Sequence, residues 1–332
     1  MRTLIVEKDK LEENTRKLKE HTTAQTKIIA VVKCNGYGLG AVEITKCLIE
    51  NGIEMFAVST VEEALELRNA GIENDILMLS CTAIREDVES LLDNSIILSV
   101  GSNEDIQIIE KVAKEKRMHV RAHLKIDTGM GRYGFVDIYK DKLIDSLKKM
   151  KNIKIEGTFS HFSCSYCNEK YTKMQFDKFL EIIGELKKNN IETGMLHICN
   201  SSAFIKYPEM HLDAVRIGSA FLGRLSFPND LKLKPIGYLE TKVAEIKEIR
   251  ITPNIEEHDF GFKAKNARKF IEDGNKVKIT VRFRGRELNY VKLGEQTLNE
   301  FIENLSDVAT PEKKPILEGK NMFIILAKKA DK

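Results

Sequence analysis

Lys33 is the residue of this chain whose type and position are most suited to chemistry. It follows an unbroken apolar run, residues 28–32, and precedes a segment punctuated by Gly36, Gly38 and Gly40. Such a run is typical of a strand buried on both faces of a parallel sheet. Parallel α/β folds build their sites at the carboxyl ends of such strands. A lysine in an apolar setting is suited to Schiff-base chemistry. The alternative is a lysine that merely reaches solvent. The glycine-rich segment favours the functional interpretation.

Other polar residues also stand where predicted strands end. These positions are held by Ser80, Lys125, Asp127, His161, Asn200, Ser201 and Arg216. On a closed barrel they would all surround one mouth together with Lys33. Convergence of hydroxyls, cations and a strand-end lysine suits a cofactor that carries both an aldehyde and a phosphate.

Two glycine-containing segments support the same mouth. Residues 129–134 supply three glycines and Arg132, and Gly218 and Ser219 supply backbone N–H groups after the last strand. The start of a short helix after Asn200 offers further N–H groups to a phosphate. The alternative for Asn200 is an ordinary helix cap, and for His161 a hydrogen-bonded strand-end residue.

Strand-like and helical segments alternate along most of the chain. We expect an initial strand over 3–6 and a helix over 8–21 with Asp9 as N-cap. The next strands are predicted at 27–32, 55–59, 76–80, 96–100, 119–126, 155–159, 195–199 and 214–217. Helices are predicted between them, and Thr60 with Glu63 forms a capping box for one. Eight such repeats predict a (β/α)8 TIM-type barrel, with an open doubly wound sheet as the alternative.

Composition limits the class of protein. The 332 residues have a net charge of +3 and allow two domains. No signal peptide and no apolar span of membrane length is evident, so we expect a cytoplasmic protein that does not enter a membrane. The six cysteines include the pair Cys164 and Cys167 in a CxxC. No second pair completes a metal site, so we expect reduced thiols and no metal.

Residues 1 to about 245 resemble the N-terminal part of the alanine racemase family, which are pyridoxal 5′-phosphate (PLP) enzymes of fold type III. The resemblance rests on the motifs AVVKCNGYGLG, HLKIDTGMGRYGF, GTFSHFS, HICNSSAF and AVRIGSAFLGR. It implies that Lys33 bonds to PLP and acts as the base on one face of an amino acid such as alanine. It also implies a phosphate site formed by Tyr37, Ser201, Gly218 and Ser219, with Asn200 beside it.

The resemblance assigns the remaining cofactor residues as well. Arg132 would lie near the phenolic oxygen of PLP, and Lys125 matches a lysine that is often carbamylated and positions that arginine. His161 would pack beside the ring. Arg216 would face the pyridine nitrogen and keep it unprotonated, which favours proton exchange at Cα. One departure is Leu39, where the family commonly has histidine.

The family places its second base, a tyrosine, in a C-terminal β-domain that reaches the barrel mouth of a partner subunit. The usual Gly-Tyr-Ala/Gly-Asp-Gly setting does not occur after Pro235, where Tyr238 and Tyr290 are the remaining tyrosines. Racemisation is therefore expected to be impaired. A homodimer is possible, although the family's dimer uses the domain that is replaced.

The C-terminal region has a different pattern. Strand-like segments at 243–251, 276–283 and 321–327 and helical ones at 257–272 and 293–305 predict a small two-layer α/β domain, with one more strand near 307–312. From Thr241 onward the chain has 19 Lys+Arg against 15 Asp+Glu. The alternatives are a solvated charged face or a surface for nucleic-acid phosphates.

Residues 242–332 resemble the C-terminal domain of bacterial translation initiation factor 3. The resemblance rests on KEIRITPNIEEHDFGFKAKNARKFIEDGNKVKITVRFRGRE and on LEGKNMFIILAKK. It implies binding to the RNA of the small ribosomal subunit. The candidate contacts are Arg250, Arg268, Arg282, Arg284, Arg286 and Lys320. Departures are the segment 288–291 and Lys320, where arginine is common.

The sequence therefore predicts two joined domains, a PLP barrel over 1–240 and an initiation-factor-like domain over 241–332. The favoured function is that of an alanine racemase-type protein with an impaired mechanism. The alternatives are PLP binding without turnover and binding to the small ribosomal subunit.

Overall fold

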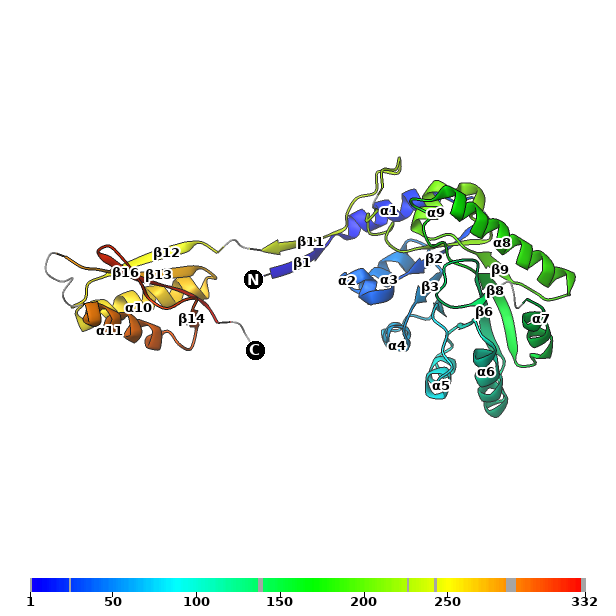
Figure 1. Cartoon of the computed structure of the whole chain (residues 1–332), viewed down its shortest axis with the longest axis horizontal. Coiled ribbons are helices and arrows are strands. Elements are labelled where there is room, and N and C mark those ends of the chain that lie inside the picture. Colours follow the sequence, from blue (N-terminus) through cyan, green and yellow to red (C-terminus); the bar gives the residue numbers. More distant parts are fainter. Residues whose placement is uncertain are drawn as a thin grey trace. The chain divides into compact units, whose positions relative to one another are not determined.

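The chain folds into two compact units, each built around its own hydrophobic core. The structure is a computed structural model that describes residues 2–23, 25–136, 140–225, 227–241, 244–284 and 291–329. One unit spans Leu4–Tyr238, and the other comprises Leu239–Lys332 with Met1–Thr3 (Figure 1). Strand β1 (Arg2–Val6) pairs with β11 (Gly237–Thr241) in a separate two-stranded sheet.

Eight parallel strands form the first unit's barrel. They are β2 (Lys27–Val31), β3 (Met55–Val58), β4 (Asp75–Met78), β5 (Leu98–Val100), β6 (Val120–Asp127), β8 (Ile153–Phe159), β9 (Met195–His197) and β10 (Ala214–Ile217). The order of neighbours is β4-β3-β2-β10-β9-β8-β6-β5, and the short β7 (Phe135–Val136) pairs with β6. A parallel bridge between Leu77 and Ile97 joins the two ends. The predicted (β/α)8 barrel is therefore confirmed.

Apolar side chains fill both sides of the barrel wall. Inside, Ile29, Val31 and Ala57 belong to a compact cluster with Met55, Leu77, Ile97 and Ala214. Alternate residues of the same strands, such as Ala30 and Phe56, pack outward against the helices. Because both faces of β2, β3 and β4 are buried, these strands carry continuous apolar runs instead of alternating ones. This is why the run before Lys33 identified a barrel strand.

The helices lie on the outside of the barrel, as Figure 1 shows. They are α1 (Lys8–His21), α3 (Ala41–Glu50), α4 (Val61–Asn69), α5 (Arg85–Asp93), α6 (Asn103–Lys116), α7 (Lys140–Lys149), α8 (Glu169–Lys188) and α9 (Ser201–Lys206). The predicted capping box of α4 is confirmed, since Thr60 and Glu63 accept each other's backbone N–H groups. The predicted cap of α1 is wrong. The N-cap is Glu7, which makes no side-chain cap bond, and Asp9 lies within the first turn.

The segment after Lys33 is not the open loop that its glycines indicate. Residues 34–37 all have positive φ and ψ, so they form one left-handed helical turn within α2 (Lys33–Gly38). Left-handed conformation costs non-glycine residues roughly 1–2 kcal/mol each. The turn is held by the bonds from the Cys34 N–H to Glu63 and from the Gly36 N–H to the Val32 carbonyl oxygen. It places Lys33 and Tyr37 on the same side of the barrel.

The second unit has two layers. Strand β12 (Ile246–Ile251) runs parallel to β13 (Lys276–Arg282), and β13 pairs antiparallel with β16 (Asn321–Lys328). β16 also pairs with β14 (Ala309–Pro311) and β15 (Ile316–Glu318). Helices α10 (Glu257–Glu272) and α11 (Val291–Asn304) cover one face of this sheet. The predicted two-layer α/β domain is confirmed.

Two details of the second unit differ from expectation. β15 is an additional strand. Its residues 316–318 are all exposed, so the sequence lacks the alternation of buried and exposed residues that would predict a strand there. The first strand begins at Ile246, and Val243 lies outside the described residues. None of the helices in the described parts of the chain is long and apolar enough to cross a membrane.

Candidate active site

One cavity of about 510 Å³ opens at the carboxyl ends of the barrel strands. Its lining includes every residue predicted for the cofactor except one: Lys33, Tyr37, Arg132, His161, Asn200, Ser201, Arg216, Gly218 and Ser219. The exception is Lys125, which is buried against the rings of Tyr133 and Phe159. The lining also contains residues that the sequence did not single out, among them Tyr133 and Phe159. These two aromatic rings form an apolar wall beside the polar groups.

Lys33 lies directly after β2 and is partly exposed at the cavity wall. This differs from the buried, apolar setting that its strand predicts. The difference arises because β2 ends at Val31, so the lysine already belongs to the left-handed turn. A primary amine in this position is accessible to a small molecule that enters the mouth.

A small polar cradle lies on the neighbouring wall. The Ser201 hydroxyl accepts the Gly218 N–H at 3.1 Å. The Tyr37 hydroxyl lies so close to Gly218 that a Cβ added there would be 2.2 Å from it. Only glycine therefore leaves room for the phenol at position 218. The hydroxyls of Tyr37 and Ser201 converge here and can donate hydrogen bonds to a phosphate. The Gly218 N–H that was also expected to do so is already donated to Ser201.

Asn200 lines the cavity, but its side chain is occupied as a helix cap. Its Oδ1 accepts the N–H groups of Ser202 and Ala203 at 3.1 and 3.0 Å and the Ser165 hydroxyl at 3.0 Å. The expectation that these helix-start N–H groups are free for a phosphate is therefore wrong. Asn200 supports the cradle by fixing the start of α9, from which Ser201 projects.

Arg216 is the electrostatic centre of the site, and it is 3% exposed. Its guanidinium donates to the carbonyl oxygens of Ser160, His197 and Ile198, and also to ring nitrogens of His197 and His161. None of these partners is a carboxylate. Burial lowers the pKa of Arg216 to about 10, which still leaves the group charged at neutral pH. The site thus contains a fixed cation whose charge is balanced by dipoles alone.

Two buried histidines extend this network. Arg216 donates to Nδ1 of His197 at 2.7 Å, so the proton of that ring is on Nε2. His197 Nε2 then donates to Nδ1 of His123 at 2.8 Å. Burial is the main cause that lowers the pKa of both histidines, to about 4 for His123 and well below the ordinary value for His197. The chain of bonds therefore holds Arg216 in one orientation without a second charge.

His161 is held neutral for the same reasons. Burial and the nearby Arg216 guanidinium lower the pKa of His161 well below its ordinary range. Its Nδ1 accepts a bond from that guanidinium at 3.2 Å. A neutral imidazole can pack against an aromatic cofactor ring without adding charge.

Lys125 is 2% exposed and sits under the aromatic wall. Its Nζ lies 5.4 and 5.6 Å from the ring centroids of Tyr133 and Phe159 and donates to the Ile126 carbonyl oxygen at 2.7 Å. The Arg132 guanidinium lies 4.9 Å from the Tyr133 centroid, so both cations face this ring. Burial lowers the pKa of Lys125 to about 8. A substantial fraction of the amine is therefore neutral near that pH, and a neutral amine is the form that carbon dioxide can carboxylate.

We expect Lys125→Met to stabilise the protein at neutral pH. Below pH 8 the lysine is charged in both the folded and the unfolded state, and burial of that charge disfavours folding. Its removal should raise the free energy of unfolding by about 2 kcal/mol, after allowance for the lost hydrogen bond. Wild-type stability should rise between pH 8 and pH 10.5, because the unfolded lysine binds a proton that the folded one has lost.

Urea unfolding of both proteins at pH 7 and pH 10 measures this difference. The advantage of Lys125→Met should shrink at pH 10. A variant that is less stable than wild type at pH 7 would show that Lys125 carries a stabilising carboxyl group or a stronger network than its bonds indicate.

The candidate RNA residues are spread over the second unit. Arg250, Arg282 and Lys320 line one hollow of about 500 Å³ on the sheet. Arg268 lies on α10 and forms a bidentate pair with Asp307, so it has a structural partner. Arg284 is described just beyond β13, whereas Arg286 lies outside the described residues.

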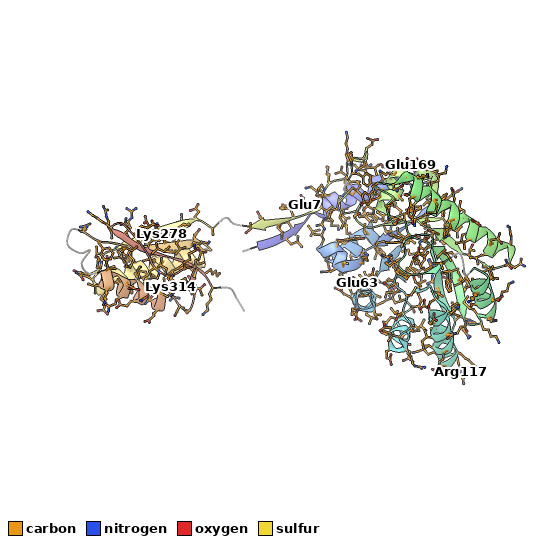
Figure 2. The ribbon with its side chains drawn as sticks, in the orientation of Figure 1. Glu7, Glu63, Arg117, Glu169, Lys278 and Lys314 are labelled. Carbon is orange, nitrogen blue, oxygen red and sulfur yellow. The ribbon has the colours of Figure 1, made fainter. Side chains whose placement is uncertain are left out.

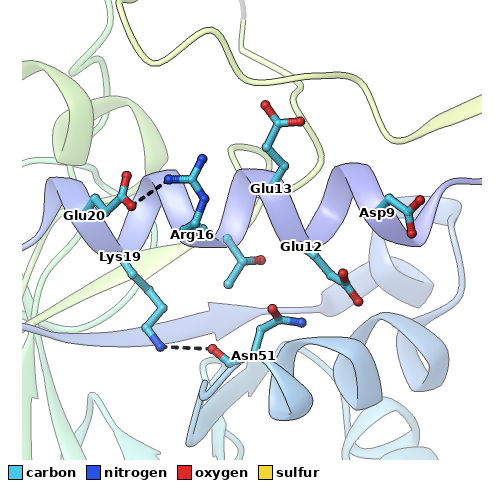
Figure 3. Close-up of a pocket in the computed structure, with 8 residues that line it drawn as sticks. Asp9, Glu12, Glu13, Arg16, Lys19, Glu20 and Asn51 are labelled. Atoms are coloured by element: carbon cyan, nitrogen blue, oxygen red, sulfur yellow. Dashed lines mark hydrogen bonds and ion pairs between the residues drawn. The ribbon is translucent and has the colours of Figure 1, made fainter.

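A further hollow lies outside the barrel between α1 and α3 (Figure 3). Its lining includes Asp9, Glu12, Glu13 and Glu20, which point in different directions in Figure 3. Glu20 pairs with Arg16, and Glu13 pairs with Lys17 and Lys234. Glu13 and Glu20 are therefore neutralised by neighbouring cations, and the four carboxylates do not converge on one point. Within the described ranges no group of three or more His, Cys, Asp or Glu side chains could hold a metal ion.

Comparison with known families agrees with this arrangement of a barrel and a separate small domain. Residues 6–225 match the N-terminal domain of alanine racemase, and residues 244–329 match the C-terminal domain of translation initiation factor IF-3. The chain belongs to the alanine racemase family, whose barrel domain is joined here to an IF-3 C-terminal domain. The alanine racemase family uses PLP.

Individual relatives show how far the likeness extends. The alanine racemase of Methanococcus maripaludis is 35% identical over 247 residues, which cover 72% of this chain and 65% of that protein. Alanine racemase 1 of Clostridium acetobutylicum is 39% identical over 236 residues, 67% of this chain and 59% of that protein. The chain therefore spans less than two thirds of the length of these relatives. The solved Bacillus anthracis alanine racemase superimposes with a TM-score of 0.69 at 30% identity and covers 76% of this chain and 68% of its own.

Proposed function

We propose that the barrel mouth binds PLP through Lys33 and acts on a small amino acid such as alanine. The observation that carries this proposal is the single cavity that brings Lys33, the Tyr37–Ser201–Gly218 cradle and Arg216 together. The residues fit the group, because an amine, a phosphate cradle and a fixed cation stand on separate walls of one cavity. The solved Bacillus anthracis alanine racemase contains bound L-Ala-P.

Bound PLP supplies an electron sink that acidifies the Cα proton of an amino acid. The residues of the chain then determine how strong that sink is. Arg216 stays charged and donates hydrogen bonds only, so it cannot protonate a pyridine nitrogen that faces it. A weakened sink favours proton return to Cα over other reactions. Lys33, at the open wall, is placed to hold and move that proton on one face.

We propose that racemisation is slow, because no tyrosine among the described residues takes the place of the family's opposite-face base. Tyr238 lies in β11 and is 51% exposed, and Tyr290 lies outside the described residues. Tyr133 is the phenol that lines the cavity together with Tyr37, but its hydroxyl donates to the Leu79 carbonyl oxygen at 2.8 Å. Burial raises the pKa of Tyr133, which opposes its use as a base. The same proposal includes a homodimer. It also includes a cytoplasmic location, with which the six free cysteines agree.

A racemase assay on the purified chain, with and without added PLP, tests the proposed activity. Slow interconversion of L- and D-alanine that depends on PLP supports it. PLP binding with neither interconversion nor proton exchange at Cα supports the alternative of a barrel that holds PLP without turnover. Absence of any response to PLP contradicts both.

A second candidate function is binding to RNA of the small ribosomal subunit through the C-terminal domain. The hollow that combines Arg250, Arg282 and Lys320 favours it. Cosedimentation with small subunits at rising salt measures this association. Binding that weakens with salt and with Arg282→Ala supports the candidate, since counterion release governs phosphate contacts. Binding that responds to neither change contradicts it.

A further inference from the structure

The sheet of the second unit has one face covered by helices and one face open. Val277, Ile279 and Val281 of β13 pack in the core against α10 and α11. The alternate residues of the same strand, Lys278 and Arg282, therefore lie on the opposite face. Figure 1 shows both helices on one side of the sheet, and Figure 2 shows Lys278 on the other side. This open face contains the 500 Å³ hollow.

Phe323 occupies the centre of the open face. In the register of the sheet it stands opposite Thr280 of β13 and Ile316 of β15, and Thr280 stands opposite Arg250 of β12. The Lys278 Nζ lies 3.8 Å from the centroid of the Phe323 ring. Phe323 is a partly exposed aromatic ring in the middle of the sheet. The Lys278 ammonium covers one face of the ring, so a flat group stacks on this face when the flexible lysine side chain turns away to pair with a phosphate.

Positive charge surrounds this ring. Arg250, Lys278, Arg282 and Lys320 line the hollow with Phe323, against two carboxylates, Glu248 and Glu318. Glu248 is already bonded to Arg250 and to the Thr280 hydroxyl. The lining therefore retains a positive balance. Its cations lie on β12, on β13 and in the turn before β16, around the central ring. A partner complementary to this face combines flat aromatic groups with closely spaced negative charges.

We propose that the open sheet face binds a single-stranded nucleic-acid segment, with one unpaired base stacked on Phe323 and phosphates on the surrounding cations. Every base has a π face, and stacking of this kind tolerates different sequences. A duplex cannot use the site in this way because its bases are already stacked on one another. The inference rests on the second candidate function, to which it adds a stacking residue and a preference for unpaired strands.

The matched variants are Phe323→Ile and Phe262→Ile. Phe262 is the suitable control because it is 62% exposed on α10, which covers the other face of the sheet. Isoleucine is a strong strand former, so the sheet should tolerate it at position 323. A second pair of variants, Lys278→Gln and Lys265→Gln, removes one positive charge each. Lys265→Gln is the control, because Lys265 is exposed on α10.

Fluorescence anisotropy of the full chain with a labelled ten-nucleotide oligouridylate measures the binding. Phe323→Ile should weaken binding by about tenfold, and Phe262→Ile should leave it unchanged. Lys278→Gln should weaken binding and lessen its salt dependence, whereas Lys265→Gln should do neither. Duplex RNA should bind more weakly than the single strand, and an oligothymidylate of equal length shows whether the site distinguishes RNA from DNA.

Equal binding by wild type, Phe323→Ile and Lys278→Gln would overturn the inference, as would preference for the duplex. If small subunits still bind in an Arg282-dependent manner, that outcome leaves the second candidate function intact. If the chain binds neither the oligonucleotide nor the small ribosomal subunit, both the stacking inference and the second candidate function fail.

Discussion

Lys33→Ala should abolish retention of PLP by the barrel. Lys33 is the amine that lines the cavity, and the remaining predicted contacts to PLP are reversible hydrogen bonds and charge interactions. Wild-type protein passed through a desalting column after incubation with PLP should keep about one cofactor per chain and show the visible absorbance of lysine-bound PLP. The variant should lose both, and any proton exchange at Cα should fall by at least about a hundredfold.

The control for this experiment is Lys46→Ala. Lys46 lies on α3, pairs with Glu43 and is outside the cavity. Free PLP also reacts with exposed lysines, so every protein should keep a small background of PLP. Lys46→Ala should keep the same background as wild type and, in addition, about one PLP per chain. If Lys33→Ala retains as much PLP as wild type, Lys33 is not the amine that binds PLP.

The second prediction concerns the two faces of the substrate. In heavy water containing PLP, alanine of one configuration should exchange its Cα proton for deuterium faster than it inverts. General acid–base catalysis contributes typically 10²–10⁴-fold, so the lack of a second positioned base should slow inversion relative to exchange by about this factor. Proton NMR of the Cα position and chiral chromatography measure the two rates on the same sample.

Tyr133→Phe tests the phenol that lines the cavity. Its hydroxyl donates to the Leu79 carbonyl oxygen, so its loss should leave the exchange rate within about threefold of wild type and slow inversion no further. Inversion as fast as exchange in wild type, and its loss in Tyr133→Phe, would instead identify Tyr133 as the opposite-face base.

Much of the barrel could be predicted from sequence because its strands are buried on both faces. The apolar run before Lys33 follows directly from this burial. The capping box of Thr60 and Glu63 could also be predicted, since it depends on two residues that are three positions apart in the sequence. The position of Lys33 and Arg216 at strand ends predicted that they share one mouth, and the glycine-containing segment predicted the same for Arg132. All three line one cavity.

The features that were missed depend on contacts between distant parts of the chain. The left-handed turn at residues 34–37 rests in part on a bond to Glu63 of α4, which the glycine pattern does not reveal. The His123–His197 pair joins strands β6 and β9 inside the wall. Sequence offered one usable signal for it, a histidine in each of two predicted barrel strands. Tyr133 could have been considered as well, because it follows Arg132 in the glycine-containing segment.

Borohydride reduction of the full chain mixed with PLP, followed by peptide mass spectrometry, tests the central claim most directly. Reduction fixes PLP to the amine that holds it, so the labelled peptide identifies that amine. We predict a single pyridoxyl group on the peptide that contains Lys33, at close to one per chain, and its absence when PLP is omitted. Label spread evenly over exposed lysines, or concentrated on a lysine outside the cavity, would contradict the assignment of this mouth as the PLP site.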